Sequence, residues 1–229
     1  MTDQPSPPSN RRTLGCLLEV VETLALTAIL FWVIQSFVAQ PFQVQQKSMM
    51  DTIQDGQFVL VDRLTPRFDP YHRGDIVVFA PPKPNSESPE QKPFIKRVIG
   101  VARDTVELRD GVVFVNDVAL DEPYVFAVDG VAQPTTQEDG NVRWVVPDGM
   151  LFVMGDHRAQ SSDSRAFGPI EVSSVVGRAW LRYWPLAAFS ILPTASHPEL
   201  ASPSASPKPS PKATAKPTAK PKPTRTPRP

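Results

Sequence analysis

The chain has 229 residues, which is long enough for one sizeable domain with extensions. Its formal net charge is zero, but residues 201–229 carry seven Lys/Arg and no acid, which leaves the remainder at about −7. An acidic body argues against nucleic-acid binding, and the single cysteine, Cys16, cannot form an internal disulfide.

The amino end precedes a long apolar segment. Residues 1–16 are predicted to be a disordered, cytoplasmic end, rich in Pro, Ser and Asn, with Arg11 and Arg12 as its only basic residues. Residues 17–39 are almost wholly apolar, and residues 23–40 contain no charge. A helix of that uncharged length spans about 27 Å, close to the roughly 30 Å hydrocarbon core of a bilayer.

Two other interpretations of this segment are weaker. A cleaved signal peptide needs small residues at the third and first positions before the cut. Cutting after Ala39 places Phe37 at the third position, and cutting after Val38 places a branched residue at the first. A buried core helix is rarely free of charge over such a length. We therefore predict an uncleaved transmembrane signal-anchor helix over residues 17–39.

The basic residues set the expected orientation of this anchor. Arg11 and Arg12 precede the segment, whereas only Lys47 follows it closely. Positive charge favours the cytoplasmic side, so we expect a single-pass protein of the cell (plasma) membrane whose amino end is cytoplasmic. Everything after residue 40 then lies outside the cytoplasm.

The body after the anchor reads as short alternating strands separated by turn residues, with little helical periodicity. Turn signals include Asp110-Gly111 and Asn116-Asp117, and residues 81–93 form a polar, Pro-rich loop. This pattern predicts a mainly β fold, with one β-rich extracytoplasmic domain over residues 40–193. The predicted strands cover residues 57–62, 76–79, 94–101, 105–108, 112–115, 118–120, 143–146, 150–154 and 174–183.

The carboxyl end changes composition. Residues 194–229 are rich in Pro, Lys and Ala, with nine prolines in 201–229, so this tail has little to bury and is predicted to be disordered. It serves either as a spacer or as an electrostatic attachment to anionic lipid or wall polymer. Just before it, Trp180, Trp184 and residues 186–192 form an apolar stretch that suits either the membrane interface or the core.

Three patches carry residues suited to chemistry. Ser48 lies in a Ser-Met-Met triplet just after the anchor, and a serine needs a base to become a nucleophile. Lys96 lies among Ile95, Val98 and Ile99. A lysine titrates at about pKa 10.4 in water, and desolvation lowers this toward about 8, which makes a usable neutral base. Taken alone, Lys96 fits a solvated strand residue better.

The third patch, residues 154–168, is the most specific: Met-Gly-Asp-His-Arg-Ala-Gln-Ser-Ser-Asp-Ser-Arg-Ala-Phe-Gly. A polar loop of this density is either a surface turn or a rigid support for a buried site. The three patches together resemble the bacterial type I signal peptidases (leader peptidases) over most of residues 17–190. The serine box, Ser48 to Ile53, matches the family's Ser-Met-x-Pro-Thr-Leu at four of six positions if Ile replaces Leu.

The resemblance implies a role for each matching residue. Ser48 is the nucleophile and Lys96, in the family's Lys-Arg strand, is the general base. Ser161 hydrogen-bonds and orients the Lys96 amine, while Asp163 and Arg165 pair as a structural support. No histidine among His72, His157 and His197 is an obvious alternative base for the serine.

The resemblance also implies a substrate pocket and an oxyanion hole. Apolar pockets for small side chains at positions −1 and −3 are expected from Phe42, Val44, Ile53 and Ile95. The oxyanion is expected at the backbone N–H of Ser48. Gln46 stands where many members have a small or hydroxylated second donor; its amide can donate a hydrogen bond but is larger.

Some positions depart from the family pattern. Asp51 replaces a proline, Lys47 lies beside the nucleophile, and His157 replaces an asparagine. These departures motivate two alternatives: a catalytically impaired homologue that acts as a membrane-tethered binding module, or a peptidase dedicated to one substrate. A cytosolic self-cleaving repressor shares the Ser–Lys chemistry, but the anchor and the lack of a DNA-binding helical domain argue against it.

The sequence therefore predicts a membrane-anchored serine endopeptidase with a Ser–Lys dyad. It is expected to remove signal peptides from exported proteins after small residues at −1 and −3, without a metal or other cofactor. The expected partners are the signal peptides of secreted preproteins, membrane lipid and the protein-export machinery.

Overall fold

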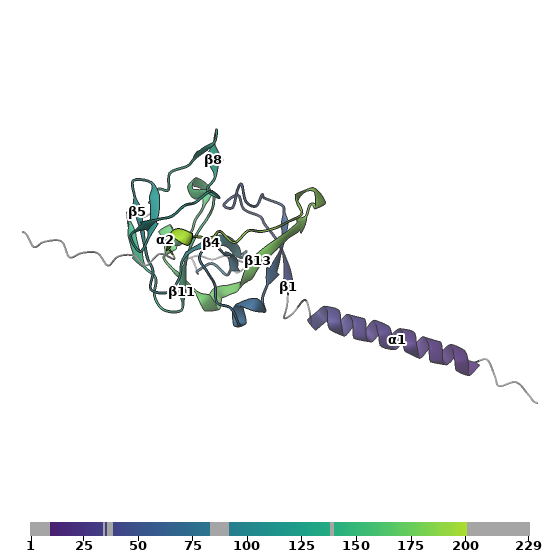
Figure 1. Ribbon diagram of the computed structural model, residues 1–229. Coiled ribbons are helices and arrows are strands. Elements are labelled where there is room, and N and C mark those ends of the chain that lie inside the picture. The colour runs from purple at the N-terminus through teal and green to yellow at the C-terminus, as the bar shows by residue number, and fades with distance from the viewer. Residues whose placement is uncertain (1–9, 34, 36–38, 83–91, 138–139, 201–229) are drawn as a thin grey trace, which may run out of the picture.

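The computed structural model describes residues 10–33, 35, 39–82, 92–137 and 140–200, and Figure 1 shows a long helix beside a β body. Helix α1, Asn10–Val33, contains no proline and is rich in Leu, a strong helix former. Its Gly15–Val33 part has a mean hydropathy of 2.0 and is long and apolar enough to cross a membrane. Its apolar side chains are exposed, Leu18 for example at 65%.

The principal sheet contains eight strands, in the order β1-β2-β13-β3-β4-β11-β12, with β14 paired to β13. All of its pairings are antiparallel. The sheet therefore combines segments from both ends of the body. Its strands are β1 Ala39–Gln43, β2 Phe58–Asp62, β3 Ile76–Phe79, β4 Phe94–Gly100, β11 Met150–Met154, β12 Ile170–Glu171, β13 Val175–Trp184 and β14 Ser190–Ile191.

A second sheet has four strands in the order β10-β5-β6-β7, and a separate hairpin joins β8 to β9. The β5–β6 turn uses Asp110 and Gly111 at φ 50° and 82°, and the β6–β7 turn uses Asn116 and Asp117 at 53° and 67°. Positive φ at both central residues suits tight hairpin turns. The strands are β5 Thr105–Arg109, β6 Val112–Val115, β7 Val118–Ala119, β8 Ala127–Val128, β9 Val131–Ala132 and β10 Arg143–Val145.

Short helical turns complete the fold. They lie between strands and bury few residues, except near the loop that follows β11. The helix α2 is Ser164–Phe167, and the 3₁₀ turns are η2 Thr65–Arg67, η3 Arg158–Gln160, η4 Val172–Ser174, η5 Leu186–Ala188 and η6 Pro198–Leu200.

Strand β3 shows how the core is arranged. Ile76 and Val78 belong to one buried apolar cluster, whereas Val77 and Phe79 belong to another. Successive side chains of a strand point to opposite faces, so β3 is covered on both sides. The first cluster also contains Met49, the residue after Ser48, which ties the turn that begins at Ser48 to the core.

The mainly β fold predicted from the sequence is confirmed, and so is each of the nine predicted strands to within two residues at either end. The prediction missed β1, β8, β9, β12 and β14, which have between two and five residues each. Helix α1 begins at Asn10 rather than at residue 17, and β1 begins at Ala39, the last residue of the predicted anchor.

The described chain also continues past the predicted tail boundary at residue 193. Ala195 N–H donates to the carbonyl oxygen of Gly74 at 3.3 Å, and Thr194 Oγ1 donates to Asp75 Oδ1 at 3.2 Å. The rest of the predicted tail, residues 201–229, lies outside the described residues. So do residues 1–9 of the predicted amino end and residues 83–91 of the predicted loop.

Candidate active site

Ser48 and Lys96 lie together in the interior of the β body. Lys96 Nζ is 2.7 Å from Ser48 Oγ, and the two residues are 1% and 3% exposed. Ser48 begins a turn that follows β1, and Lys96 is the third residue of β4. The two strands are four places apart in the sheet, so only the curvature of the sheet brings their residues together.

The segment before Ser48 runs beside the segment before Lys96. Lys92 Nζ donates to Gln45 Oε1 at 2.5 Å, and Lys96 Nζ donates to Gln46 Oε1 at 3.4 Å. Lys96 Nζ also donates to the carbonyl oxygen of Ile95 at 3.1 Å. The amine of Lys96 is therefore buried among oxygen atoms of both segments.

Gly155 separates Ser48 from Ser161. A Cβ atom at Gly155 would lie 2.6 Å from the carbonyl oxygen of Ser48 and 2.3 Å from Ser161 Oγ. The two serines therefore approach one another through a position that only glycine fits. Ser161 Oγ donates to Asp163 Oδ2 at 2.7 Å. Its predicted contact with the amine of Lys96 stays a prediction.

Asp163 and Arg165 form a fully buried ion pair. Arg165 Nε lies 2.9 Å from Asp163 Oδ1, and Arg165 Nη2 lies 2.9 Å from Asp163 Oδ2. The carboxylate also accepts hydrogen bonds from the backbone N–H groups of Arg165 and Gly155. The arginine donates to the backbone carbonyls of Thr136 and Arg158 as well. These bonds satisfy both charges and hold the loop after β11 in one shape.

Sequence reasoning missed a second buried ion pair, between Arg97 and Asp156. Arg97 Nη2 lies 2.7 Å from Asp156 Oδ2, and Thr52 Oγ1 donates to the same oxygen at 2.5 Å. Burial alone lowers the pKa of Arg97, but the Asp156 carboxylate outweighs that effect and raises it. Thr52 belongs to the turn that begins at Ser48 and Arg97 follows Lys96, so this pair links the two segments. The sequence signal that could have predicted this pair is the opposite charge of the arginine in the Lys-Arg motif and the aspartate in the Gly-Asp motif.

A hollow of about 260 Å³ opens beside Ser48 and Lys96, and its lining includes Gln46 and Lys92. Two of the predicted pocket residues, Phe42 and Ile95, line it. The other two, Val44 and Ile53, are 0% exposed and lie in the core cluster against which Phe42 packs. The remaining lining residues are Gln43, Gln45 and Pro93.

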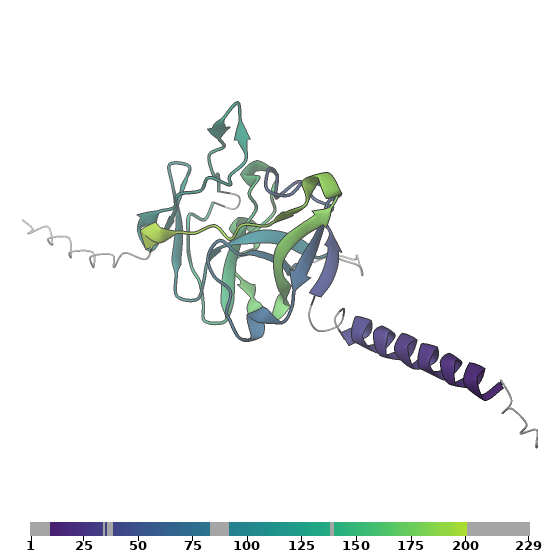
Figure 2. The same ribbon diagram turned by 45° about the vertical axis from the view of Figure 1, so that its right-hand side comes forward.

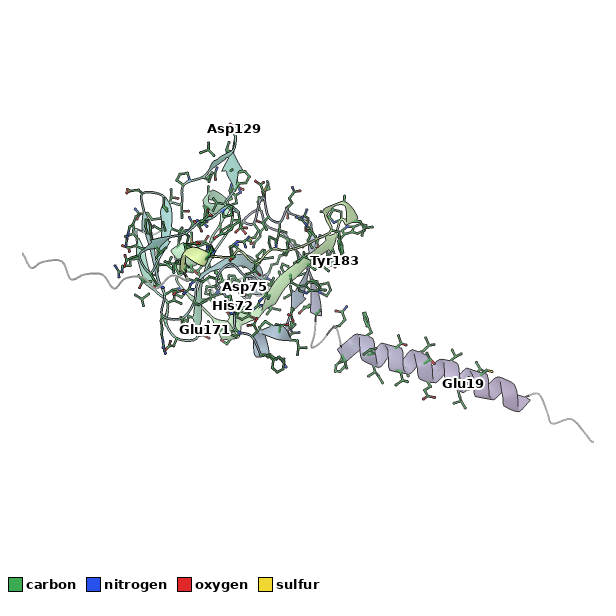
Figure 3. The ribbon with its side chains drawn as sticks, in the orientation of Figure 1. Glu19, His72, Asp75, Asp129, Glu171 and Tyr183 are labelled. Atoms are coloured by element: carbon green, nitrogen blue, oxygen red, sulfur yellow. The ribbon has the colours of Figure 1, made fainter. Side chains whose placement is uncertain are left out.

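His157 contacts Ser48 through its backbone. Its N–H donates to the carbonyl oxygen of Ser48, whereas its ring stacks on Phe126 with the centroids 4.1 Å apart. In Figure 3 the labelled His72 lies next to Asp75, to which its backbone N–H donates a hydrogen bond at 2.8 Å. Among the described residues, no three His, Cys, Asp or Glu side chains are grouped so as to hold a metal ion.

Comparison with known proteins gives consistent matches. Residues 17–184 match the family described as signal peptidase, peptidase S26. The chain is 34% identical over 160 residues to signal peptidase I of Bacillus caldolyticus, covering 67% of this chain and 84% of the relative. It is 34% identical over 187 residues to the probable signal peptidase I-2 of Synechocystis sp., covering 82% and 80%. It is 31% identical over 183 residues to signal peptidase IB of Staphylococcus aureus, covering 76% and 92%.

Proposed function

Because the chain belongs to the signal peptidase family, peptidase S26, we propose that Ser48 and Lys96 are its catalytic dyad. Membership makes the chain a signal peptidase I, a serine endopeptidase that removes signal peptides from preproteins. The observation that carries the assignment of the dyad is the 2.7 Å contact between Lys96 Nζ and Ser48 Oγ at a buried site.

The chemistry follows from this contact. Neutral Lys96 takes the proton of Ser48 while Ser48 Oγ attacks the scissile carbonyl carbon. The tetrahedral intermediate collapses, the C–N bond breaks, and Lys96 gives its proton to the leaving amine. Water then attacks the acyl-enzyme with Lys96 again as base, which releases the signal peptide and restores Ser48. General-base catalysis of this kind contributes about 10²- to 10⁴-fold to the rate.

The negative oxygen of the intermediate requires donors. We assign the backbone N–H of Ser48 as the first donor, in line with the family resemblance. Gln46 is the candidate for the second, since its side chain reaches the dyad, with Oε1 3.4 Å from Lys96 Nζ. Removal of one such donor typically costs about 10²- to 10³-fold in kcat.

The loop after β11 supports the base in this scheme. Ser161 orients the Lys96 amine, and the ion pair of Asp163 and Arg165 holds Ser161 in place. The short Ser161–Asp163 hydrogen bond and the closeness of Ser161 to Gly155 support this assignment. The role of Asp163 and Arg165 is positional, because both are buried and bonded to the loop itself.

The substrate binds as an added strand beside β4. Strand β11 pairs with β4 only from Arg97 onward, so Phe94 to Lys96 have no β11 partner. An extended signal peptide can pair there, with small side chains at −1 and −3 in the hollow of Phe42 and Ile95. A hollow of about 260 Å³ suits small side chains. Val44 and Ile53 contribute by fixing the wall behind Phe42.

We also assign the membrane arrangement. Helix α1 anchors the chain with its amino end cytoplasmic, and the β body over residues 40–193 works outside. Figures 1 and 2 show α1 and η5 on the same side of the body. Around η5, Leu186, Phe189 and Ile191 are 71%, 60% and 71% exposed, which suits contact with lipid. Leu192 instead lies in the core. The export machinery would deliver preproteins to this surface.

The test uses full-length protein in detergent with a preprotein that carries an Ala-x-Ala site. Wild type, Ser48→Ala and Lys96→Ala are compared with Ser162→Ala, which alters an exposed serine near the site. We expect the shorter product from wild type and Ser162→Ala only. Equal cleavage by Ser48→Ala would remove the proposed nucleophile. No cleavage by any form of several preproteins would favour the tethered binding module.

A further inference from the structure

A second cavity, of about 560 Å³, lies beside the turn of residues 48–52, here called the nucleophile turn, and shares no lining residue with the hollow. Its walls come from five parts of the chain, two of which are the single residues Arg97 and Arg182. Asp51 and Thr52 belong to the nucleophile turn, Tyr124 and Ala127 lie in or before β8, and Ser190 lies in β14.

The hollow and the cavity lie on either side of the dyad, both along the segment that contains Ser48 and along β4. In the segment that contains Ser48, residues up to Gln46 line the hollow, and residues from Asp51 onward line the cavity. In β4, Ile95 lines the hollow and Arg97 lines the cavity. An extended peptide with its −1 and −3 side chains in the hollow passes the dyad at its scissile bond. Its next residues then lie toward the cavity, about 3.3 Å further for each residue.

The charged side chains that line the cavity differ in whether they already have partners within the protein. Asp51 is exposed and is the only acidic residue of the lining; within the part of the chain that the structure describes, its carboxylate has no hydrogen bond or ion pair. Arg97 is already paired with Asp156. The nitrogens of Arg182 donate to four neutral oxygens, including the carbonyl oxygen of Thr52, so its guanidinium group is held by hydrogen bonds within the protein.

We propose that this cavity receives the preprotein residues that follow the scissile bond, and that Asp51 favours a positive charge among them. The proposal rests on the proposed function, since it places the scissile bond at Ser48. Asp51 acts on specificity and not on the chemical step, because it contacts the departing side of the substrate. The partner chemistry is therefore a basic segment at the amino end of the mature protein.

The test compares three preproteins that are identical up to the scissile bond and differ in the second mature residue, which is Lys, Gln or Glu. Each is cleaved by wild type, Asp51→Asn, Asp51→Lys and Asp55→Asn, and kcat/KM is measured at low salt. Asp55 is the matched control, because it is exposed in the next turn of the chain but does not line the cavity.

We expect wild type and Asp55→Asn to prefer the Lys over the Glu substrate by about two- to fivefold, the range of an exposed ion pair. Asp51→Asn should remove the preference, Asp51→Lys should reverse it, and added salt should weaken it. Equal rates on all three substrates with wild type, or an unchanged preference in Asp51→Asn, overturn the proposal. Failure of wild type to cleave even the Gln substrate would instead overturn the proposed function, and this inference with it.

Discussion

The backbone N–H of His157 donates a 2.9 Å hydrogen bond to the carbonyl oxygen of Ser48. This bond joins the loop after β11 directly to the residue that we propose as nucleophile. The same loop carries Gly155, which packs against that carbonyl, and Asp156, which pairs with Arg97. The position of Ser48 therefore depends on a loop that lies far from it in sequence.

Replacement of Gly155 by alanine tests this dependence. The added Cβ would lie 2.6 Å from the backbone oxygen of Ser48, so backbone atoms must shift. We expect a loss of about 1–3 kcal/mol in the free energy of unfolding, as for other overpacked sites, and at least a tenfold loss of kcat. Gly15→Ala is the control, because nothing lies within 4 Å of its Cβ position. Wild-type activity and stability in Gly155→Ala would contradict the packing described.

The buried pair of Arg97 and Asp156 predicts a large stability effect. Asp156→Ala leaves the Arg97 charge buried without its carboxylate, which typically costs about 3–5 kcal/mol. Asp148→Ala removes the ion pair between Asp148 and Arg103, whose side chains are 71% and 83% exposed. The loss of this exposed pair should cost under about 1 kcal/mol. Urea unfolding in detergent measures both changes. Similar costs for the two variants would show that burial does not decide the strength of the pair.

Ser161→Ala tests the proposed orientation of the base. Loss of the hydroxyl should lower kcat by about tenfold or more with little change in KM, since the substrate hollow does not include Ser161. It should also shift the acid limb of the pH–rate profile, because the position of that limb reports the pKa of the general base. Ser162→Ala, which changes an exposed neighbour, should leave both unchanged. A lowered kcat with an unmoved pH profile would indicate a structural role only.

Tyr71 predicts a stability change in the alkaline range. Burial raises its pKa to about 12; the Arg178 charge works against this, and the Asp75 charge adds to it. The unfolded tyrosine ionises at about pH 10, so the contribution of Tyr71 is complete below pH 10 and is lost as the pH rises toward 12. Wild type should therefore lose more stability than Tyr71→Phe between pH 10 and 12. Parallel urea midpoints across that range would contradict the prediction.

Much of the fold follows from local pattern. The run from Ile76 to Phe79 predicted a strand that turned out to be covered on both faces. The pairs Asp110-Gly111 and Asn116-Asp117 predicted turns, and both have the positive φ that tight hairpins need. Two-residue strands such as β8 and β9 were missed, because two residues carry no periodicity.

The sequence by itself determined which residue types are available: a serine after an apolar helix, a lysine in an apolar strand, and a polar loop with paired charges. Only the tertiary structure decided that Lys96 Nζ lies 2.7 Å from Ser48 Oγ. It also decided that Val44 is sealed in the core while Phe42 lines the hollow. The reason is physical: these contacts join segments distant in sequence, and they depend on the curvature and packing of the whole sheet, which no local pattern encodes.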